Sequence, residues 1–152
     1  MERREMLIGG SAIAASLIAQ FANAEEHVHG SDEHEHHHEH APRKYAALAA
    51  TAADCVKTGQ ICIDHCLEMF SQGDNSTAAC ARSVNQLLPV CAALQQLAAQ
   101  NSKYLKKFAS FAQELCRDCE KECRKHEKEH QACRDCAESC AACAKECDAV
   151  TA

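Results

Sequence analysis

The pattern of apolar and polar positions predicts a helical protein. From about residue 43 onward, apolar residues and cysteines recur at steps of three and four, which places their side chains on one face of an α-helix. We expect helices over residues 43–71, 76–100 and 102–126, and a fourth from the 126–130 segment to about residue 149.

The breaks between these helices carry turn residues. Gly73 suits the position after a helix end, and one of residues 74–76 (Asp, Asn and Ser) can cap the helix that follows. Asn101 and Ser102 mark the second break. Short connections between amphipathic helices favour antiparallel neighbours, so the predicted fold is all-α, an antiparallel up-down-up-down four-helix bundle.

Two residues disturb the expected helices. Pro89 lies inside the second helix, where it removes the hydrogen bond to the carbonyl of Asn85 and is expected to kink the helix. Gly59 lies on the inward face of the first helix, where it costs helix stability and opens room for a ligand or a close neighbour.

Cysteine replaces Leu, Ile and Val on the inward face of all four helices. On the fourth helix, steps of three, four, three and four separate the five cysteines from Cys133 to Cys147. The chain holds 13 cysteines. All of them fit inward positions: Cys55, Cys62, Cys66, Cys80, Cys91, Cys116, Cys119, Cys123, Cys133, Cys136, Cys140, Cys143 and Cys147.

The antiparallel arrangement predicts which of these side chains meet. The connection between the first two helices and the connection between the last two lie at the same end of the bundle, which we call the mouth. We expect the mouth to collect His65, Met69, Cys62, Cys66, Cys80, Cys116, Cys119, Cys123, Cys133, Cys136 and Cys140. Cys55, Cys91, Cys143 and Cys147 are expected deeper, and Tyr45, Leu48, Leu94, Leu105 and Phe108 are expected to close the opposite end.

Residues 1–24 have the features of a signal peptide. Arg3 and Arg4 precede a moderately apolar stretch, and residues 22–24 form an A-x-A cleavage site. The arginine pair favours the twin-arginine route for folded proteins, although Glu5 departs from the usual context; a plain secretory signal is the alternative. We therefore expect a periplasmic protein with no membrane span after the signal is removed.

Residues 25–42 separate this signal from the Cys-rich bundle of residues 43–152. They contain seven His and six acidic residues and almost nothing to bury. We expect a disordered leader. It serves either as a polar spacer or as a weak ligand of Cu(II), Zn(II) or Ni(II) through its imidazoles.

Composition and context exclude several function classes. The formal charge of −6 is spread along the chain without a basic stripe, so no nucleic-acid partner is expected. C-x-x-C pairs occur in mid-helix with no activating base and no βαβ pattern, which disfavours a redox enzyme. We expect a protein without catalytic activity.

Several chemistries use grouped cysteines. Thirteen is odd, and cysteines three and four residues apart on one helix bridge poorly, yet a disulfide-stapled helical interaction module is the alternative hypothesis. Zn(II) takes separate sets of four ligands, and the continuous ladder does not divide into such sets. The bacterial iron–sulfur pattern ends in Cys-Pro, which does not occur in this sequence.

Cu(I) fits the ladder best. It is soft, prefers thiolate and thioether, and tolerates low coordination numbers. Two thiolates can hold one ion and one thiolate can bridge two, so a ladder of thiols becomes a chain of sites holding roughly ten ions.

Three cysteine-rich stretches of the sequence resemble those of a known family. The stretches CVKTGQICIDHCLEM (55–69), LCRDCEKEC (115–123) and CRDCAESCAACAKEC (133–147) are similar to those of the bacterial copper storage proteins. The resemblance implies a four-helix bundle binding many Cu(I) ions, assembly into homotetramers, and release of copper to a copper-requiring enzyme or chaperone. The leader resembles that of the exported branch.

The resemblance also implies His and Met ligands where the metal enters. His65 and Met69 match that pattern, whereas Gln72 and Thr77 stand where more methionines are expected. Uptake then relies more on His65, and either His126 and His130 take part in it or they are solvated surface residues.

Overall fold

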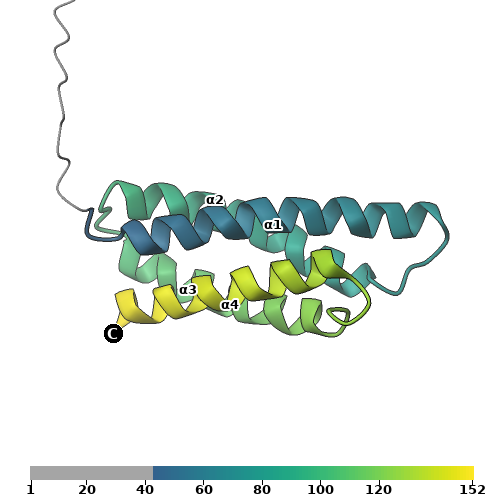
Figure 1. Ribbon diagram of the computed structural model, residues 1–152. Coiled ribbons are helices and arrows are strands. Elements are labelled where there is room, and N and C mark those ends of the chain that lie inside the picture. Colours follow the sequence, from purple (N-terminus) through teal and green to yellow (C-terminus); the bar gives the residue numbers. More distant parts are fainter. Residues whose placement is uncertain (1–42) are drawn as a thin grey trace, which may run out of the picture. The chain divides into compact units, whose positions relative to one another are not determined.

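The computed structural model describes residues 43–152, and the expected signal peptide and His-rich leader lie outside this range. Four helices follow one another: α1 (Ala46–Ser71), α2 (Ala78–Ala99), α3 (Leu105–Arg124) and α4 (Gln131–Thr151). Each packs on its neighbour in the chain, and α4 closes the ring against α1. The α1–α2 and α3–α4 turns lie at the same end of the bundle (Figure 1). The predicted antiparallel four-helix bundle is confirmed.

The end of α1 shows why the chain turns at Gly73. The amide of Asp74 donates to the carbonyl of Met69 and the amide of Gly73 donates to that of Phe70, each at 3.0 Å. These two bonds define a Schellman motif, which needs a left-handed residue. Gly73 supplies it with φ of 84°. The expected role of Gly73 is confirmed.

The α2–α3 connection repeats this motif with a different residue. Ser102 N–H donates to Leu97 C=O at 3.0 Å, and Asn101 N–H donates to Ala98 C=O at 3.2 Å. Asn101 takes the left-handed position with φ of 50°. Asparagine is one of the few residues that tolerate this conformation.

The second and third helices begin later than the sequence pattern predicts. Asp74 accepts a hydrogen bond from the Ser76 amide at 2.8 Å, so its carboxylate closes a turn instead of capping α2. The residue at the N-cap of α2 is Thr77, whose side chain makes no capping bond. Before α3, the Ser102 hydroxyl accepts a hydrogen bond from the Tyr104 amide at 3.3 Å. Competition from such local turns explains both delayed starts.

Pro89 does not interrupt α2, which runs without a break from Ala78 to Ala99. Pro89 and Asn85 are both exposed. Water can therefore reach the Asn85 carbonyl, which loses its helical partner to the proline.

The core changes character along the bundle. At the end where α1 begins and α2 ends, it is built from small and branched hydrocarbon side chains: Leu48, Ala52, Leu94, Ala98, Leu105, Ala109 and Ala112. Tyr45 and Phe108 cover this group and are half-buried. The predicted hydrocarbon plug is confirmed.

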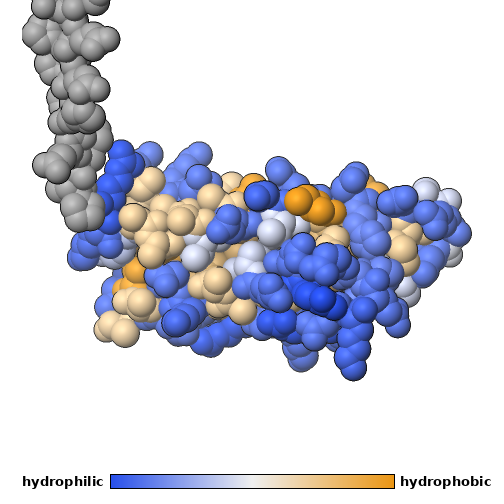
Figure 2. All heavy atoms as spheres, in the orientation of Figure 1, coloured by the Kyte–Doolittle hydropathy of each residue, from blue (hydrophilic) through white to orange (hydrophobic). Residues whose placement is uncertain are grey.

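The outer surface is mostly hydrophilic in the view of Figure 2. Four large apolar side chains are exposed in residues 43–152: Ile61, Leu67, Tyr104 and Phe111. None of the four helices has the length and apolarity needed to cross a membrane.

Candidate metal centre

All 13 cysteines lie in the core of the bundle, and the structure records every one as a free thiol. Each has a relative exposure of 0%. Two buried cysteines come from α2, and each of the other helices supplies three or more. The periodic steps in the sequence therefore point sulfur inward on all four helices, as predicted.

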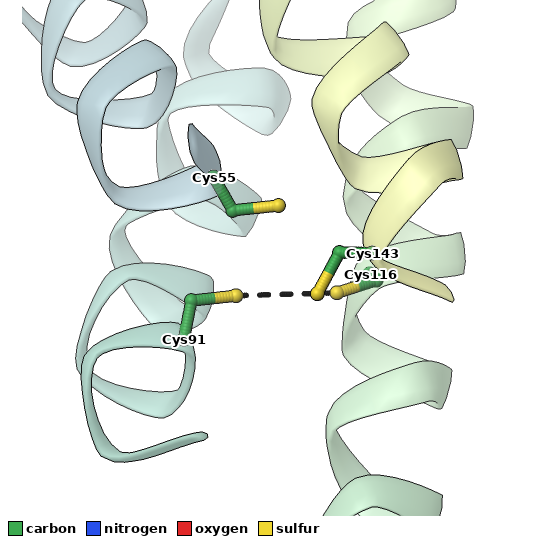
Figure 3. A group of neighbouring side chains, drawn as sticks. All are labelled: Cys55, Cys91, Cys116 and Cys143. Carbon is green, nitrogen blue, oxygen red and sulfur yellow. Dashed lines mark hydrogen bonds between the residues drawn. The ribbon is translucent and has the colours of Figure 1, made fainter. Parts of the chain in front are cut away.

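One group lies near the hydrocarbon plug, and of the α4 cysteines only Cys147 lies closer to the plug. Cys55, Cys91, Cys116 and Cys143 come from α1, α2, α3 and α4 in turn, and their sulfurs all lie within 4.8 Å of one another. Their side chains point toward a common centre (Figure 3). The Sγ atoms of Cys91 and Cys116 are 4.0 Å apart. We call these four residues the deep group.

The deep group corrects two expectations. Cys116 was expected at the mouth, but it lies level with Cys55 and Cys91. The thiols were also expected not to divide into sets of four; one such set forms, and the other grouped thiols form overlapping sets of three. Helical periodicity shows which side chains point inward, whereas the level at which two helices meet depends on the turn between them.

Nearer the mouth, the sulfurs form three overlapping triads. In each triad the sulfurs lie within 4.8 Å of one another: Cys62–Cys66–Cys80, Cys62–Cys123–Cys136 and Cys119–Cys136–Cys140. Cys62 belongs to two triads and so does Cys136. A thiolate in two ligand sets is placed to bridge two metal ions.

Short contacts join the triads into one network. Cys80 Sγ lies 3.2 Å from Cys123 Sγ, and Cys62 Sγ lies 3.9 Å from Cys133 Sγ. At the other end, Cys140 contacts Cys55 and Cys147 contacts Cys143. The cysteine side chains therefore form a continuous series of contacts from Cys147 to Cys66.

The crowded thiols perturb one another's ionisation. Hydrogen bonds from Cys116 and then Cys140 lower the pKa of Cys55 to about 5. The pKa of Cys140 is raised because its hydrogen bonds to Cys119 and Cys136 favour the protonated thiol. Burial raises the pKa of Cys66. A few thiolates are thus stabilised by neighbours that keep their protons, which limits the charge in the core.

The mouth carries the predicted histidine and methionine. Met69 and His65 are half-buried on the last turns of α1. The His65 ring lies 4.7 Å from that of His130, and its Nε2 atom is buried without a hydrogen-bond partner. The His126 ring lies 6.4 Å from that of His130. His126 and His130 are half-buried, so they are not fully solvated surface residues.

Three residues that the metal-site prediction left out shape this core. Ser139 places its backbone carbonyl 3.2 Å from Cys55 Sγ, which donates to it when the thiol is protonated. Thr77 is fully buried, its hydroxyl lacks a hydrogen-bond partner, and it lies beside Cys66. The room at Gly59 is taken by α2, since an added Cβ would lie 2.9 Å from Leu88 Cδ2. The space at Gly59 therefore serves a close neighbour and not a ligand.

Comparison with known proteins identifies the family. The sequence matches the family model described as copper storage protein over residues 40–152. The chain belongs to the copper storage protein family. A curated relative from Bacillus subtilis (strain 168), the uncharacterized cysteine-rich protein YhjQ, is 29% identical over 84 residues, which cover 55% of this chain and 76% of YhjQ.

Solved structures of a copper storage protein share the fold. The chain resembles apo-Csp3 (copper storage protein 3) from Bacillus subtilis with a TM-score of 0.60 and 28% identity, covering 70% of this chain and 97% of that one. It also resembles the Cu(I)-bound copper storage protein BsCsp3 with a TM-score of 0.62 and 26% identity, covering 72% of this chain and 100% of that one. The match thus takes in nearly the whole of each solved copper storage protein.

Proposed function

We propose that this protein stores or buffers copper by binding several Cu(I) ions to the thiolates of its core, without catalysing a reaction. The sharing of Cys62 and Cys136 between triads carries the proposal. A core of hydrocarbon would fold equally well, and a structural metal site would need only one set of ligands. Overlapping sets of three soft ligands are what a multinuclear Cu(I)–thiolate cluster requires.

Charge supports the same assignment. The thiols are buried, and isolated charges in such a place are costly. Each Cu(I) that replaces one thiol proton leaves the core near neutrality. A divalent ion would have to displace two protons to leave the charge of the core unchanged. The similarity to a Cu(I)-bound member of the family agrees with this choice.

The mouth is the proposed path of uptake and release. His65 and Met69 offer an imidazole and a thioether next to the triad of Cys62, Cys66 and Cys80. His130 lies against His65 and can share in the first contact with the ion. All 13 thiols, together with His65 and Met69, are the proposed ligands.

The proposal also covers the location of the protein, its assembly and the recipient of its copper. The arginine pair and the A-x-A site of the first 24 residues support export by the twin-arginine route to the periplasm. A protein that folds before export can reach an oxidising compartment with its thiols already buried. Assembly into a tetramer, and delivery to a copper-requiring enzyme or chaperone, are proposed from family resemblance.

An anaerobic titration of the reduced protein with Cu(I), in competition with a chromophoric chelator, tests the proposal. We expect the chelator to remain copper-free until roughly ten ions per chain have been bound. The double variant Cys62→Ser/Cys136→Ser should bind several fewer ions, because it breaks all three triads. Saturation of the parent protein at one or two ions would rule out storage.

Two controls make the titration specific. Deletion of residues 25–42 should leave the Cu(I) count unchanged, because imidazoles bind Cu(I) more weakly than thiolates do. Thiol counting after purification without reductant separates storage from a disulfide-stapled bundle. Most of the 13 thiols should react after unfolding, whereas extensive stapling would leave few.

A further inference from the structure

The mouth of the bundle is closed in this structure. Each of the 13 thiols has a relative exposure of 0%, and the Nε2 atom of His65 is also buried. The His65 ring lies 4.7 Å from the ring of His130, which belongs to the connection between α3 and α4. An ion that enters at the mouth therefore reaches the triad of Cys62, Cys66 and Cys80 only after a covering segment has moved.

The α3–α4 connection, residues 125–130, is the covering segment that its own backbone chemistry fixes least. We call it the mouth loop. The α1–α2 turn at the same end of the bundle (Figure 1) is fixed by its Schellman motif and by Gly73. The mouth loop contains no Gly or Pro, and none of its residues has a left-handed backbone. Side-chain contacts must therefore hold it in place.

Arg134 ties the mouth loop to α4. From the first turn of α4 it donates two hydrogen bonds to the backbone carbonyl of Glu127, at 3.1 Å from Nε and 2.8 Å from Nη2. Its side chain is half-buried, and hydrogen bonds from a charged donor are stronger than neutral ones. Arg124 also pairs with the Glu127 carboxylate at 2.8 Å, but that pair is exposed to solvent and contributes less.

The bonds to Glu127 also fix both histidines of the mouth loop. His126 directly precedes Glu127, and its carbonyl accepts a hydrogen bond from the His130 amide at 3.0 Å. The two imidazole rings lie 6.4 Å apart. Release of the Glu127 carbonyl would let this turn move away from α1 and uncover the Nε2 atom of His65. Arg134 is thus connected to the mouth through the backbone of the loop.

We propose that Arg134 is a positioning residue that keeps the mouth loop closed over His65 and so sets the rate at which copper enters and leaves the core. This role rests on the proposed function in one respect, since copper must cross the mouth. Arg134 is outside the ligand set, so it affects the rates and not the number of ions bound. Because its bonds involve no ligand atom, loosening the loop speeds entry and exit by the same factor and leaves the affinity for Cu(I) unchanged.

Alkylation of the reduced, copper-free protein tests the closure without any metal. Iodoacetamide labels thiols only as they become exposed, and mass spectrometry of the peptides shows which cysteines react first. In the full-length parent protein we expect Cys66, near the mouth, to react before Cys147, near the plug. Arg134→Gln should raise the rate at Cys66 about tenfold, the effect of losing about one net hydrogen bond from the closed loop, and leave the rate at Cys147 unchanged.

Stopped-flow copper transfer tests the consequence for storage. The reduced protein is mixed anaerobically with a Cu(I)–chelator complex to follow entry, and the loaded protein is mixed with excess chelator to follow exit. Arg134→Gln should speed both processes about tenfold and bind as many ions as the parent protein. A lower affinity or fewer bound ions would instead assign Arg134 to the integrity of the core and overturn the proposal.

Two further variants make the test specific. Arg124→Gln removes the exposed pair with Glu127 but leaves the bonds to its carbonyl intact, so its rates should stay within about twofold of the parent rates. Arg134→Lys keeps one charged donor, so its rates should lie between those of the parent and Arg134→Gln. It replaces Arg134→Gln if circular dichroism shows that the latter does not fold.

The labelling result decides the proposal by itself. Unchanged labelling of Cys66 in the Arg134 variants, or an equal acceleration in Arg124→Gln, would overturn it. A parent protein that binds only one or two Cu(I) ions would overturn storage, whereas the labelling rates would still show whether Arg134 keeps the mouth loop closed.

Discussion

The two helical hairpins of the bundle face the same core with different side chains. The α3–α4 hairpin carries eight of the 13 thiols, and the buried face of α4 consists only of Cys and Ala. The α1–α2 hairpin carries five thiols, and on α2 the thiols Cys80 and Cys91 are separated by Val84 and Leu87. One hairpin is mainly a set of ligands, and the other combines ligands with a hydrocarbon core.

This difference indicates that stability and metal capacity are distributed unequally. A Cys side chain buries much less apolar area than Leu, so α4 gains little from the hydrophobic effect when no metal is bound. Val84 and Leu88 of α2 pack against Gly59 of α1 and hold that hairpin together. Bound metal ions would then supply much of the attraction that α4 lacks.

The largest expected effect is the stabilisation of the bundle by Cu(I). Ions that bind only the folded chain should raise the free energy of unfolding by at least about 4 kcal/mol when free Cu(I) is about 1,000 times its dissociation constant. Hydrogen exchange measured by mass spectrometry should slow more in peptides of α4 than in peptides of α2. Equal protection in both hairpins would contradict the comparison.

Leu87→Ala should test the hydrocarbon half. Leu87 has a relative exposure of 0%, so truncation should lower the free energy of unfolding by about 2–5 kcal/mol. The number of Cu(I) ions bound should not change. Leu67→Ala is the matched control, because Leu67 is 57% exposed and its truncation should have little effect.

Low pH should weaken copper binding, mainly through thiols that hold their protons. The pKa of Cys133 is raised to about 12: hydrogen bonding from Cys62 lowers it, but hydrogen bonding to Cys80 and burial outweigh that effect. Because its pKa is raised, Cys133 is protonated at neutral pH, and Cu(I) must displace that proton. Each displaced proton lowers the affinity about tenfold per unit of falling pH.

Cys55 should add little to the pH dependence of copper affinity near neutral pH. Its pKa is lowered to about 5, so it is already a thiolate at neutral pH and adds to the pH dependence only below about pH 5. Competition with a Cu(I) chelator at several pH values measures both effects. In Cys133→Ser the slope above pH 5 should become shallower, and an unchanged slope would show that Cys133 is not a ligand.

Sequence pattern alone predicts the fold and the inward direction of the thiols, because both depend on helical periodicity. It does not predict how the sulfurs divide into groups. Cys116 shows the reason, since its level in the bundle depends on the α2–α3 turn, whose Asn101 has a left-handed backbone. The close approach of Leu88 to Gly59 has the same origin, because it depends on how α2 is rotated against α1.

Among the core substitutions, the smallest expected effect on stability comes from Cys140→Ala. This change removes one buried heavy atom, which should lower the free energy of unfolding by about 1 kcal/mol. It also breaks the triad of Cys119, Cys136 and Cys140, so the protein should bind about one Cu(I) fewer. Calorimetry and the chelator titration measure the two quantities. A larger stability loss than that of Leu87→Ala would contradict the division of roles between the hairpins.

X-ray absorption at the copper edge of the fully Cu(I)-loaded protein tests the central claim most directly. Because Cys62 and Cys136 each belong to two triads, bound ions should share thiolates. The spectrum should show a first shell dominated by sulfur and a second shell from neighbouring copper ions. A first shell of nitrogen or oxygen, or sulfur without any copper neighbour, would contradict a core that stores Cu(I) in thiolate-bridged clusters.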